Sequence, residues 1–453
     1  MGEGNVKQLL FKMALPAVLA QLVNLLYNII DRIYIGHMPE VGGDALTGVG
    51  LFTPILMLIT AFAMLCGAGG APQAGIALGQ GNKEKAEKIM GNCFALLMIL
   101  SVFITVIFAS FCEPLLKLFS ANASPEIIPY GHTYSLIYIL GSVFVLIVMG
   151  MNVFITAQGN AKVAMLTTVI GAVINIVLDP IFIFLFKMGV AGAALATVIS
   201  QAVSAIWILR FLTSEKSVIR LKKENIRLEK KVILPCLALG ISTFVMLSTE
   251  SVSRYGGKVA VGAMTIITSI NQLITMPLSG ICQGGNPIIS FNYGAKKFGR
   301  MKEAFMTQFV ICVSYASLFC ILLMIFPRFF AGIFTQDAAL ADHAAWAIRI
   351  FFAGVFSVGF QLTCQQSFIA LGKAKVSLFL ACLRKIILLI PLIFILPTFI
   401  GNQEFAVFLA EPISDIIAAA VTATLFFITF GKIIKEGEVE PHAATASAEG
   451  EKA

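Results

Sequence analysis

Residues 89–112 read IMGNCFALLMILSVFITVIFASFC, an uncharged segment that decides the fold class. A helix needs about 20 apolar residues to cross the roughly 30 Å hydrocarbon core of a bilayer, and this segment is long enough. A barrel strand needs only about 10 residues, so the run is too long and too continuous for one. Because lipid offers no hydrogen-bond partners, the backbone N–H and C=O groups must pair within a helix.

Eleven further segments lack Asp, Glu, Lys and Arg, and we interpret them in the same way. The complete set is Met13–Ile30, Ala45–Asn82, Ile89–Cys112, Ile127–Ala161, Val163–Leu178, Met188–Leu209, Val232–Thr249, Val259–Ala295, Ala304–Pro327, Ile350–Gly372, Ile386–Gln403 and Ile416–Gly431. The short runs extend past a charge, and the long ones include their loops. The sequence therefore predicts an all-α integral membrane protein with twelve transmembrane helices.

The overall composition excludes a soluble globular protein. Of 453 residues, 58% are hydrophobic and only 12% are charged, whereas soluble domains are about 25% charged. The net charge of +8 does not imply a nucleic-acid partner, because the basic excess lies in loops beside the predicted spans. None of the nine cysteines forms a CxxC pair, so they indicate apolar packing and not a disulfide or metal framework.

The distribution of basic residues predicts the orientation in the membrane. With twelve spans and an inner amino terminus, 23 of the 32 Lys and Arg residues fall on the inner side and seven on the outer side. The remaining two, Arg384 and Lys385, lie within a span, where we expect their long side chains to extend toward the inner interface. Since cytoplasmic loops carry the excess of basic residues, both termini are predicted to be cytoplasmic.

The sequence repeats itself at an offset of about 214 residues. Gly159 and Ala161-Lys162-Val163 recur as Gly372 and Ala374-Lys375-Val376, and Ile199-Ser200 recurs as Ile413-Ser414. We therefore predict two pseudo-symmetric six-helix bundles around a central cleft, an arrangement typical of alternating-access transporters. The predicted parts are a bundle at 1–212, a cytoplasmic connector with an amphipathic helix at 213–231, a bundle at 232–435 and a disordered tail at 436–453.

Polar residues within the first bundle predict a cation-coupling site. An acid inside a membrane is costly and is therefore a functional candidate, which applies to Asp31 and Asp179. Asn175 lies one turn before Asp179, so both side chains project from one helical face, and Pro180 frees a backbone carbonyl nearby. Thr197 could add a hydroxyl, although a lone membrane threonine more often bonds its own helix. Asp31 could instead be a solvated helix end paired with the adjacent arginine.

Three acids in the second half are candidates for the substrate cleft. Glu250 either faces the cleft and meets a cationic substrate or sits at the outer rim. Glu411 and Asp415 lie one turn apart and form one acidic face. Glu411 is also the repeat mate of Thr197, at an offset of 214 residues.

Enzyme signatures are absent from the sequence. The four histidines are scattered over predicted external loops and the tail, and the chain contains no HExxH, DDxxD or phosphate-loop motif. The prediction is therefore a transporter driven by an ion gradient and not an enzyme. Two alternatives remain: a flippase for lipid-linked precursors, which should line its cleft with basic residues, and a membrane-embedded enzyme.

Several motifs, taken in their order along the chain, resemble those of a known protein family. They include Tyr27-Asn28-Ile29-Ile30-Asp31, Ala71-Pro72-Gln73, Asn175 to Phe182, Pro287 to Ala295 and Glu411-Pro412-Ile413-Ser414-Asp415. With them, the chain resembles the multidrug and toxic compound extrusion (MATE) family, in its bacterial DinF-like and MepA-like branch, from about Val6 to Lys432.

The resemblance implies antiport, in which sodium or a proton enters as an amphipathic and often cationic compound leaves. It implies a cation site formed by Asp31, Asn175, Asp179 and Thr197, which would be the sodium ligands if sodium is the coupling ion. Other branches place a carboxylate where this chain has Phe360, so coupling is expected in the first half. We expect no cofactor besides sodium or a proton, no nucleic-acid partner, a monomer and a location in the bacterial cytoplasmic membrane.

Overall fold

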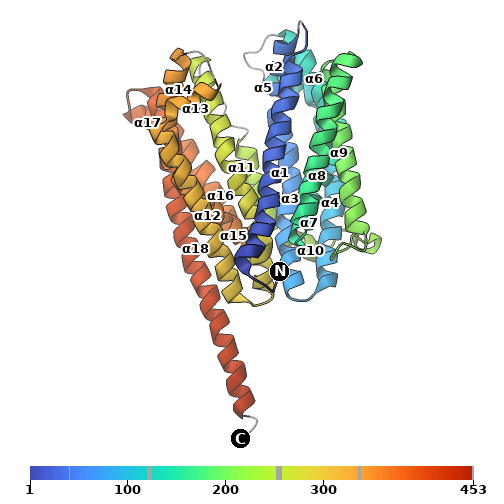
Figure 1. The fold of residues 1–453 in the computed structure, drawn as a ribbon, viewed down its shortest axis with the longest axis vertical. Helices are drawn as coiled ribbons and strands as arrows, with labels where there is room; N and C mark the ends of the chain where they lie inside the picture. The colour runs from blue at the N-terminus through green and yellow to red at the C-terminus, as the bar shows by residue number, and fades with distance from the viewer. Residues whose placement is uncertain (40, 120–124, 251–257, 335–337, 451–453) are drawn as a thin grey trace. The chain divides into compact units, whose positions relative to one another are not determined.

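The computed structural model describes residues 1–39, 41–119, 125–250, 258–334 and 338–450, with side chains left out at 119, 125, 246–250, 258–265, 338–340, 403–404 and 437–450. Within this part of the chain the secondary structure is helical and contains no strand, as predicted. The helices divide into two compact units (Figure 1). The first unit comprises Lys12–Gly75 and Asn82–Arg254, and the second comprises Met1–Phe11, Ile76–Gly81 and Tyr255–Ala453.

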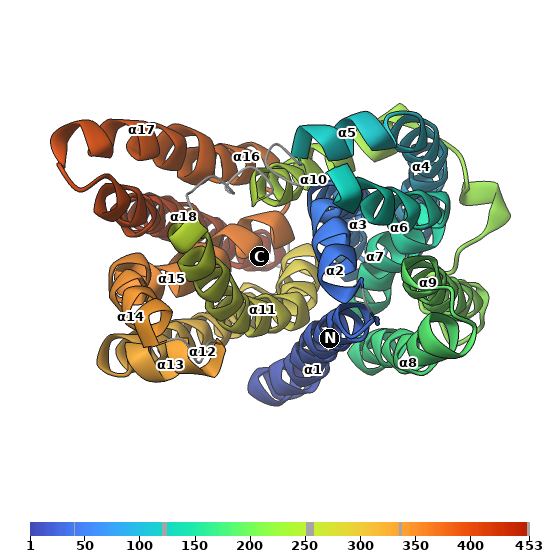
Figure 2. The ribbon, with the colours of Figure 1, turned by 90° about the horizontal axis from the view of Figure 1, so that it is seen from above.

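The first unit contains the helices before residue 255, apart from two segments. They are α1 (Val6–Gly36), α2 (Gly42–Leu51), α3 (Thr53–Gly79), α4 (Lys83–Ser110), α5 (Cys112–Phe119), η1 (Pro125–Ile127), α6 (Ile128–Leu140), α7 (Ser142–Ala157), α8 (Ala161–Pro180), the π-helical η2 (Ile181–Leu185), α9 (Val190–Thr213), η3 (Lys223–Asn225) and α10 (Lys230–Glu250). The part of α1 before Lys12 and the part of α3 after Gly75 belong to the second unit. Helices α8 and α9 run side by side, and α9 also packs against α6 and α7 (Figure 2).

The second unit contains the remaining helices. They are α11 (Lys258–Gly294), α12 (Phe298–Ile325), α13 (Pro327–Phe334), α14 (Ala338–Phe351), η4 (Phe352–Gly354), α15 (Val355–Ala370), α16 (Ala374–Cys382), the π-helical η5 (Leu383–Leu389), α17 (Ile390–Phe399) and α18 (Gln403–Gly450). Its core contains a cluster of phenylalanine rings around the fully buried Phe305 and Phe426, whose centroids lie 4.4 Å apart. Phe360 packs against Phe309 at the edge of this cluster.

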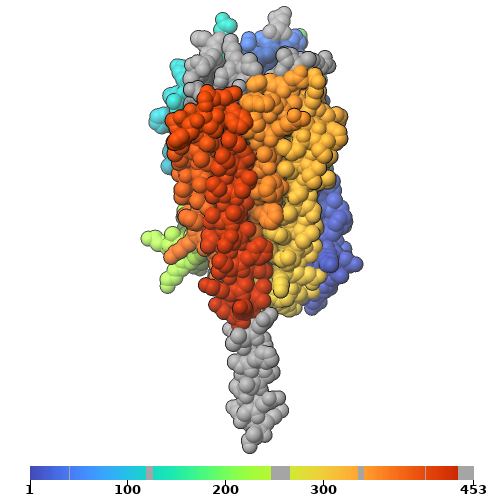
Figure 3. All heavy atoms as spheres, turned by 90° about the vertical axis from the view of Figure 1, so that its left-hand side faces the viewer, coloured from blue at the N-terminus to red at the C-terminus, as the bar shows by residue number. Residues whose placement is uncertain are grey.

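Large apolar side chains are exposed on both units, as expected for a lipid environment. Figure 3 shows the face of the second unit on which α17, α18 and α12 are displayed. On α17, the exposed fractions of Phe394 and Phe399 are 72% and 82%. Exposed rings of this kind would promote aggregation in water, but they are compatible with the hydrocarbon core of a bilayer.

The described residues contain fewer candidate membrane spans than the twelve that the sequence predicts. Nine helices in the described part are long and apolar enough to cross a membrane, and α6 with α7 forms a tenth candidate, bent by 58°. Helices α10 and α11 contain side chains that are not described, so the count of twelve stays a prediction.

Helix α10 belongs to the first unit. The sequence analysis instead placed it at the beginning of the second bundle, residues 232–435. Small residues explain the contact, because a side chain at Gly69 of α3 would collide with the backbone of Cys236, and one at Gly240 of α10 would collide with Leu65. Backbones approach this closely only where glycine removes the side chain. The ring of Phe62 also packs on Phe244 at a centroid distance of 5.0 Å.

The connector at 213–231 lacks the amphipathic helix that we predicted, since only the single turn η3 is helical there. Side chains of the first bundle bind its backbone instead. Gln158 accepts hydrogen bonds from the N–H groups of Val218 and Ile219, at 2.8 and 3.2 Å, and Asn92 accepts one from Glu229 at 2.6 Å. These long-range bonds replace the local ones that a helix would form. Farther along the chain, α18 includes residues 436–450, which we predicted to be disordered.

Candidate cation site in the first unit

Small residues bring α8 and α9 close together. Any side chain at Gly171 would meet the Ser204 hydroxyl, which donates a hydrogen bond to the Thr167 carbonyl at 3.3 Å. One at Gly192 would lie 2.8 Å from the backbone of Phe182 in η2. The close approach lets polar groups of the two helices bond each other directly, away from water.

The helical hydrogen-bond pattern changes directly after Asp179. Helix α8 ends at Pro180, and the next five residues form the wider π-helical turn η2. Proline has no N–H to donate, and π-helical turns occur mostly at functional sites. Asp179 therefore lies where the regular helix gives way, next to carbonyl groups with altered pairing.

Asn175 connects the two helices at the site. Its amide nitrogen donates hydrogen bonds to Asp179 Oδ1 at 3.2 Å and to Thr197 Oγ1 at 3.3 Å. The Thr197 hydroxyl in turn donates to the Ala193 carbonyl at 3.0 Å. The bond of Thr197 to its own helix, expected as an alternative to a site role, thus coexists with the contact to Asn175. All three predicted side chains on α8 and α9 are buried.

Asp31 of α1 completes the group of four predicted residues. Its carboxyl group lies close enough to that of Asp179 for the two groups to interact electrostatically. Only 8% of Asp31 is exposed, so the alternative of a solvated helix end is wrong.

Three buried oxygen atoms at this site have no hydrogen-bond partner in the described residues: Asp31 Oδ1, Asn175 Oδ1 and Asp179 Oδ2. In the same described residues, the carboxylates of Asp31 and Asp179 form no salt bridge. Oxygen atoms from carboxylate and amide groups are the ligands that hard cations prefer. The residues therefore fit a small cation or a proton. In the described residues, no group of three or more His, Cys, Asp and Glu is arranged so that it could hold a metal ion.

Tyrosines beside the site were not predicted from the sequence. Tyr134 and Tyr138 lie one turn apart on α6, are buried and stack with ring centroids 6.2 Å apart. The Tyr134 side chain lies close to the Thr197 hydroxyl. The only sequence signal was their spacing of four residues, which places both on one helical face but does not say which partner that face meets.

The acids of the second unit differ from the first-unit pair because they are neutralised. Arg384 of η5 binds Asp415 of α18 at 2.6 Å, and Lys385 binds Glu411 at 3.3 Å. Arg384 also lies 3.5 Å from Glu411. Our expectation that Arg384 and Lys385 extend toward the interface was wrong, because these acids hold them within the bundle. The side chain of the third cleft candidate, Glu250, lies outside the described residues.

A family profile described as MatE matches residues 16–181 and 237–395, which is more than half of the chain. The chain belongs to the MatE family. This confirms the resemblance drawn from the motifs.

The multidrug export protein MepA of Staphylococcus aureus (strain NCTC 8325 / PS 47) is 24% identical over 405 residues, which covers 86% of each chain. The protein of the same name from Staphylococcus haemolyticus (strain JCSC1435) is 22% identical over 438 residues, or 93% of this chain and 94% of the relative. The solved structure of an outward-facing multidrug resistance MATE family transporter of the MOP superfamily has a TM-score of 0.87 at 23% identity. It covers 95% of this chain and 97% of its own, and shares the fold.

Membership of the MatE family makes this chain a multi-pass membrane protein of a transporter family. The relatives are named as exporters and not as enzymes, which agrees with the absence of enzyme motifs in the sequence.

Proposed function

We propose that this MatE protein exports amphipathic, cationic small molecules in exchange for sodium ions or protons, by alternating access. The coupling ion would bind at Asp31, Asn175, Asp179 and Thr197. It is the only bound group that the mechanism requires, and the protein would work as a monomer in the bacterial cytoplasmic membrane with both termini in the cytoplasm.

One observation carries the proposal: two buried carboxyl groups lie close together and form no salt bridge in the described residues, and each has an oxygen atom that lacks a hydrogen-bond partner there. Unpaired charge inside a protein in a membrane costs several kcal/mol. A bound cation or proton removes most of that cost, so the site is expected to be occupied in one stage of the cycle and emptied in another.

Coupling follows if the two conformations bind the ion with different affinities. A ligand shifts a conformational equilibrium only by its differential affinity for the two states. The unpaired acids supply such a difference, since a conformation that admits water stabilises the empty carboxylates and a closed one stabilises the occupied pair. The neutralised acids Glu411 and Asp415 lack this property in the present conformation. Their contact with substrate stays a prediction.

The rival function, flipping of lipid-linked precursors, finds less support in the described residues. A pyrophosphate would need basic side chains in the transport path. Arg384 and Lys385 are the two basic residues that the sequence places within a span, and acids already bind both.

Efflux from reconstituted vesicles tests the proposal. The purified protein is placed in liposomes, and export of a cationic dye is followed under an inward sodium gradient and, separately, an inward proton gradient. We expect efflux under at least one gradient, with loss of at least about tenfold for Asp179→Asn, which keeps the shape but removes the charge. The matched control is Asp342→Asn, at an exposed salt bridge with Arg328, which should transport normally.

Wild-type efflux by Asp179→Asn under both gradients would show that coupling resides elsewhere, with Glu250 or Glu411 as the next candidates. Translocation of a fluorescent lipid-linked phosphate without dye efflux would establish the flippase instead. Conversion of the dye to a product would establish an enzyme.

A further inference from the structure

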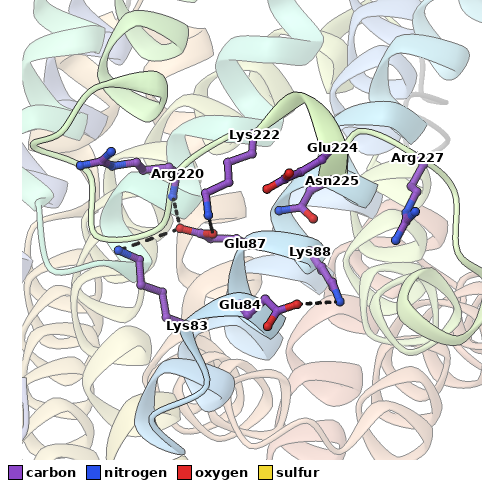
Figure 4. Close-up of a pocket in the computed structure, with 9 residues that line it drawn as sticks. All are labelled: Lys83, Glu84, Glu87, Lys88, Arg220, Lys222, Glu224, Asn225 and Arg227. Atoms are coloured by element: carbon purple, nitrogen blue, oxygen red, sulfur yellow. Dashed lines mark hydrogen bonds and ion pairs between the residues drawn. The ribbon is translucent and has the colours of Figure 1, made fainter.

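The connector and the beginning of α4 form a second polar site, which transport does not require. They line a pocket of about 750 Å³ in the first unit (Figure 4). Five of its nine lining residues are basic: Lys83, Lys88, Arg220, Lys222 and Arg227. The connector as a whole, residues 213–231, contains seven basic and three acidic residues.

Glu87 contacts residues of both α4 and the connector within the pocket. Only 2% of its side chain is exposed, and its carboxylate lies 2.7 Å from Lys222 Nζ and 4.0 Å from Lys83 Nζ. It also accepts a hydrogen bond from the Arg220 backbone at 3.2 Å. Figure 4 shows Lys222 and Lys83 converging on this one carboxylate from opposite sides. The hydrogen bond from Lys222 to Glu87 raises the pKa of the Lys222 ammonium above its ordinary value of 10.5, so Lys222 is charged at neutral pH.

The other acids in the wall do not cancel the basic groups. Glu84 is held by Lys88 at 2.9 Å, one turn along α4. A third acid, Glu224, also lines the pocket, and Arg220 and Arg227 pair with Glu215 at 3.6 Å and with Glu229 at 2.6 Å. The lining still contains five basic residues against three acids, and Arg220 has a buried Nε atom without a hydrogen-bond partner in the described residues. The lining therefore keeps an excess of two basic residues and a donor for an anionic ligand.

Apolar side chains flank the pocket on the connector. Val218, Ile226 and Leu228 are 46%, 37% and 47% exposed, whereas the intervening Ile219 and Asn225 are buried. Exposed aliphatic groups alternating with basic residues are typical of segments that lie in the membrane interface, with the aliphatic groups in lipid and the basic groups at the phosphates. The position agrees, because α4 enters the predicted span a few residues after Lys88.

We propose that this pocket binds the phosphate headgroup of an anionic phospholipid, while Val218, Ile226 and Leu228 contact its acyl chains. Basic groups immediately outside a membrane span attract anionic lipids. The buried bonds of Gln158 and Asn92 to the connector hold the site in place before the lipid arrives. Preorganisation of this kind lowers the entropic cost of binding.

Lipid titration of the full-length protein in detergent tests this inference independently of transport. Phosphatidylglycerol and phosphatidylcholine are added separately, and bound lipid is counted by native mass spectrometry. The test variant is Lys83→Gln/Lys88→Gln, which removes two pocket charges from partly exposed positions. The matched control is Lys85→Gln/Lys223→Gln, which removes two neighbouring charges that do not line the pocket. Thermal melting confirms that both variants are folded.

We expect one phosphatidylglycerol to bind tightly to the wild-type protein and phosphatidylcholine to bind at least about tenfold more weakly. In the test variant, the affinity for phosphatidylglycerol should fall by at least about tenfold. These magnitudes follow from the loss of charge-assisted hydrogen bonds. The control variant should change by less than about threefold. Equal losses in the two variants, or equal binding of both lipids, would overturn the proposal. Displacement of the lipid by millimolar inorganic phosphate would also overturn it, in favour of a site for a soluble anion.

Discussion

Replacing Gln158 by leucine should release the connector from the first unit. The side chain is only 9% exposed and its Oε1 atom accepts three hydrogen bonds, from the Ser217 hydroxyl at 2.9 Å, the Val218 N–H at 2.8 Å and the Ile219 N–H at 3.2 Å. Leucine keeps the approximate volume and removes the acceptor. Two backbone N–H groups then lose their partner.

The expected magnitude follows from the number of orphaned groups. Each buried donor left unsatisfied costs about 1–3 kcal/mol, so two of them cost about 2–6 kcal/mol if the connector stays in place. The connector can instead open to water, which limits the observable effect to its own docking free energy. We expect the free energy of local opening to fall by about 2–3 kcal/mol, equivalent to a factor of about 30 to 150 in exchange rate.

Hydrogen–deuterium exchange of the peptide that contains Val218 and Ile219 measures this directly. The control is Gln201→Leu, because the Gln201 Oε1 atom has no hydrogen-bond partner in the described residues and its loss should leave exchange of the connector unchanged. Exchange of the Val218 and Ile219 amides within about threefold of wild type in Gln158→Leu would refute the idea that this side chain holds the connector. If the connector is released, lipid binding at the adjacent pocket should also weaken.

Two further predictions concern the charged groups within the spans. Asp31→Asn and Asp179→Asn should each reduce coupled efflux by at least about tenfold. The double variant should be no worse than either single one, because both acids serve one site. Additive losses in the vesicle assay would show two separate sites. Arg384→Met should lower the unfolding free energy by about 3–5 kcal/mol by leaving Asp415 buried and unpaired. The double variant Arg384→Met/Asp415→Leu should recover most of it, and a thermal melt that shows no recovery would contradict the pairing.

Local patterns in the sequence were sufficient for the fold class and for three of the four residues of the candidate cation site. Uncharged runs such as Ile89–Cys112 predict helices because their length must match the bilayer, whatever they pack against. Asn175 and Asp179 share a face because they are one helical turn apart, and an acid within a span is rare enough to be noticed alone. Thr197 was the weakest candidate, and its inclusion depended on the family resemblance.

Contacts between distant residues were decided only by the tertiary structure. Nothing in the sequence around Gln158 indicates that it binds a segment some 60 residues away, and the connector was therefore predicted as a helix. The same limit applies to Tyr134 beside Thr197, to Arg384 beside Asp415 and to α10, which the glycines at 69 and 240 attach to the first unit. Periodicity and hydropathy depend on the chain's own neighbours, whereas the partner of a buried polar group is fixed by which helix faces meet, and that is a property of packing.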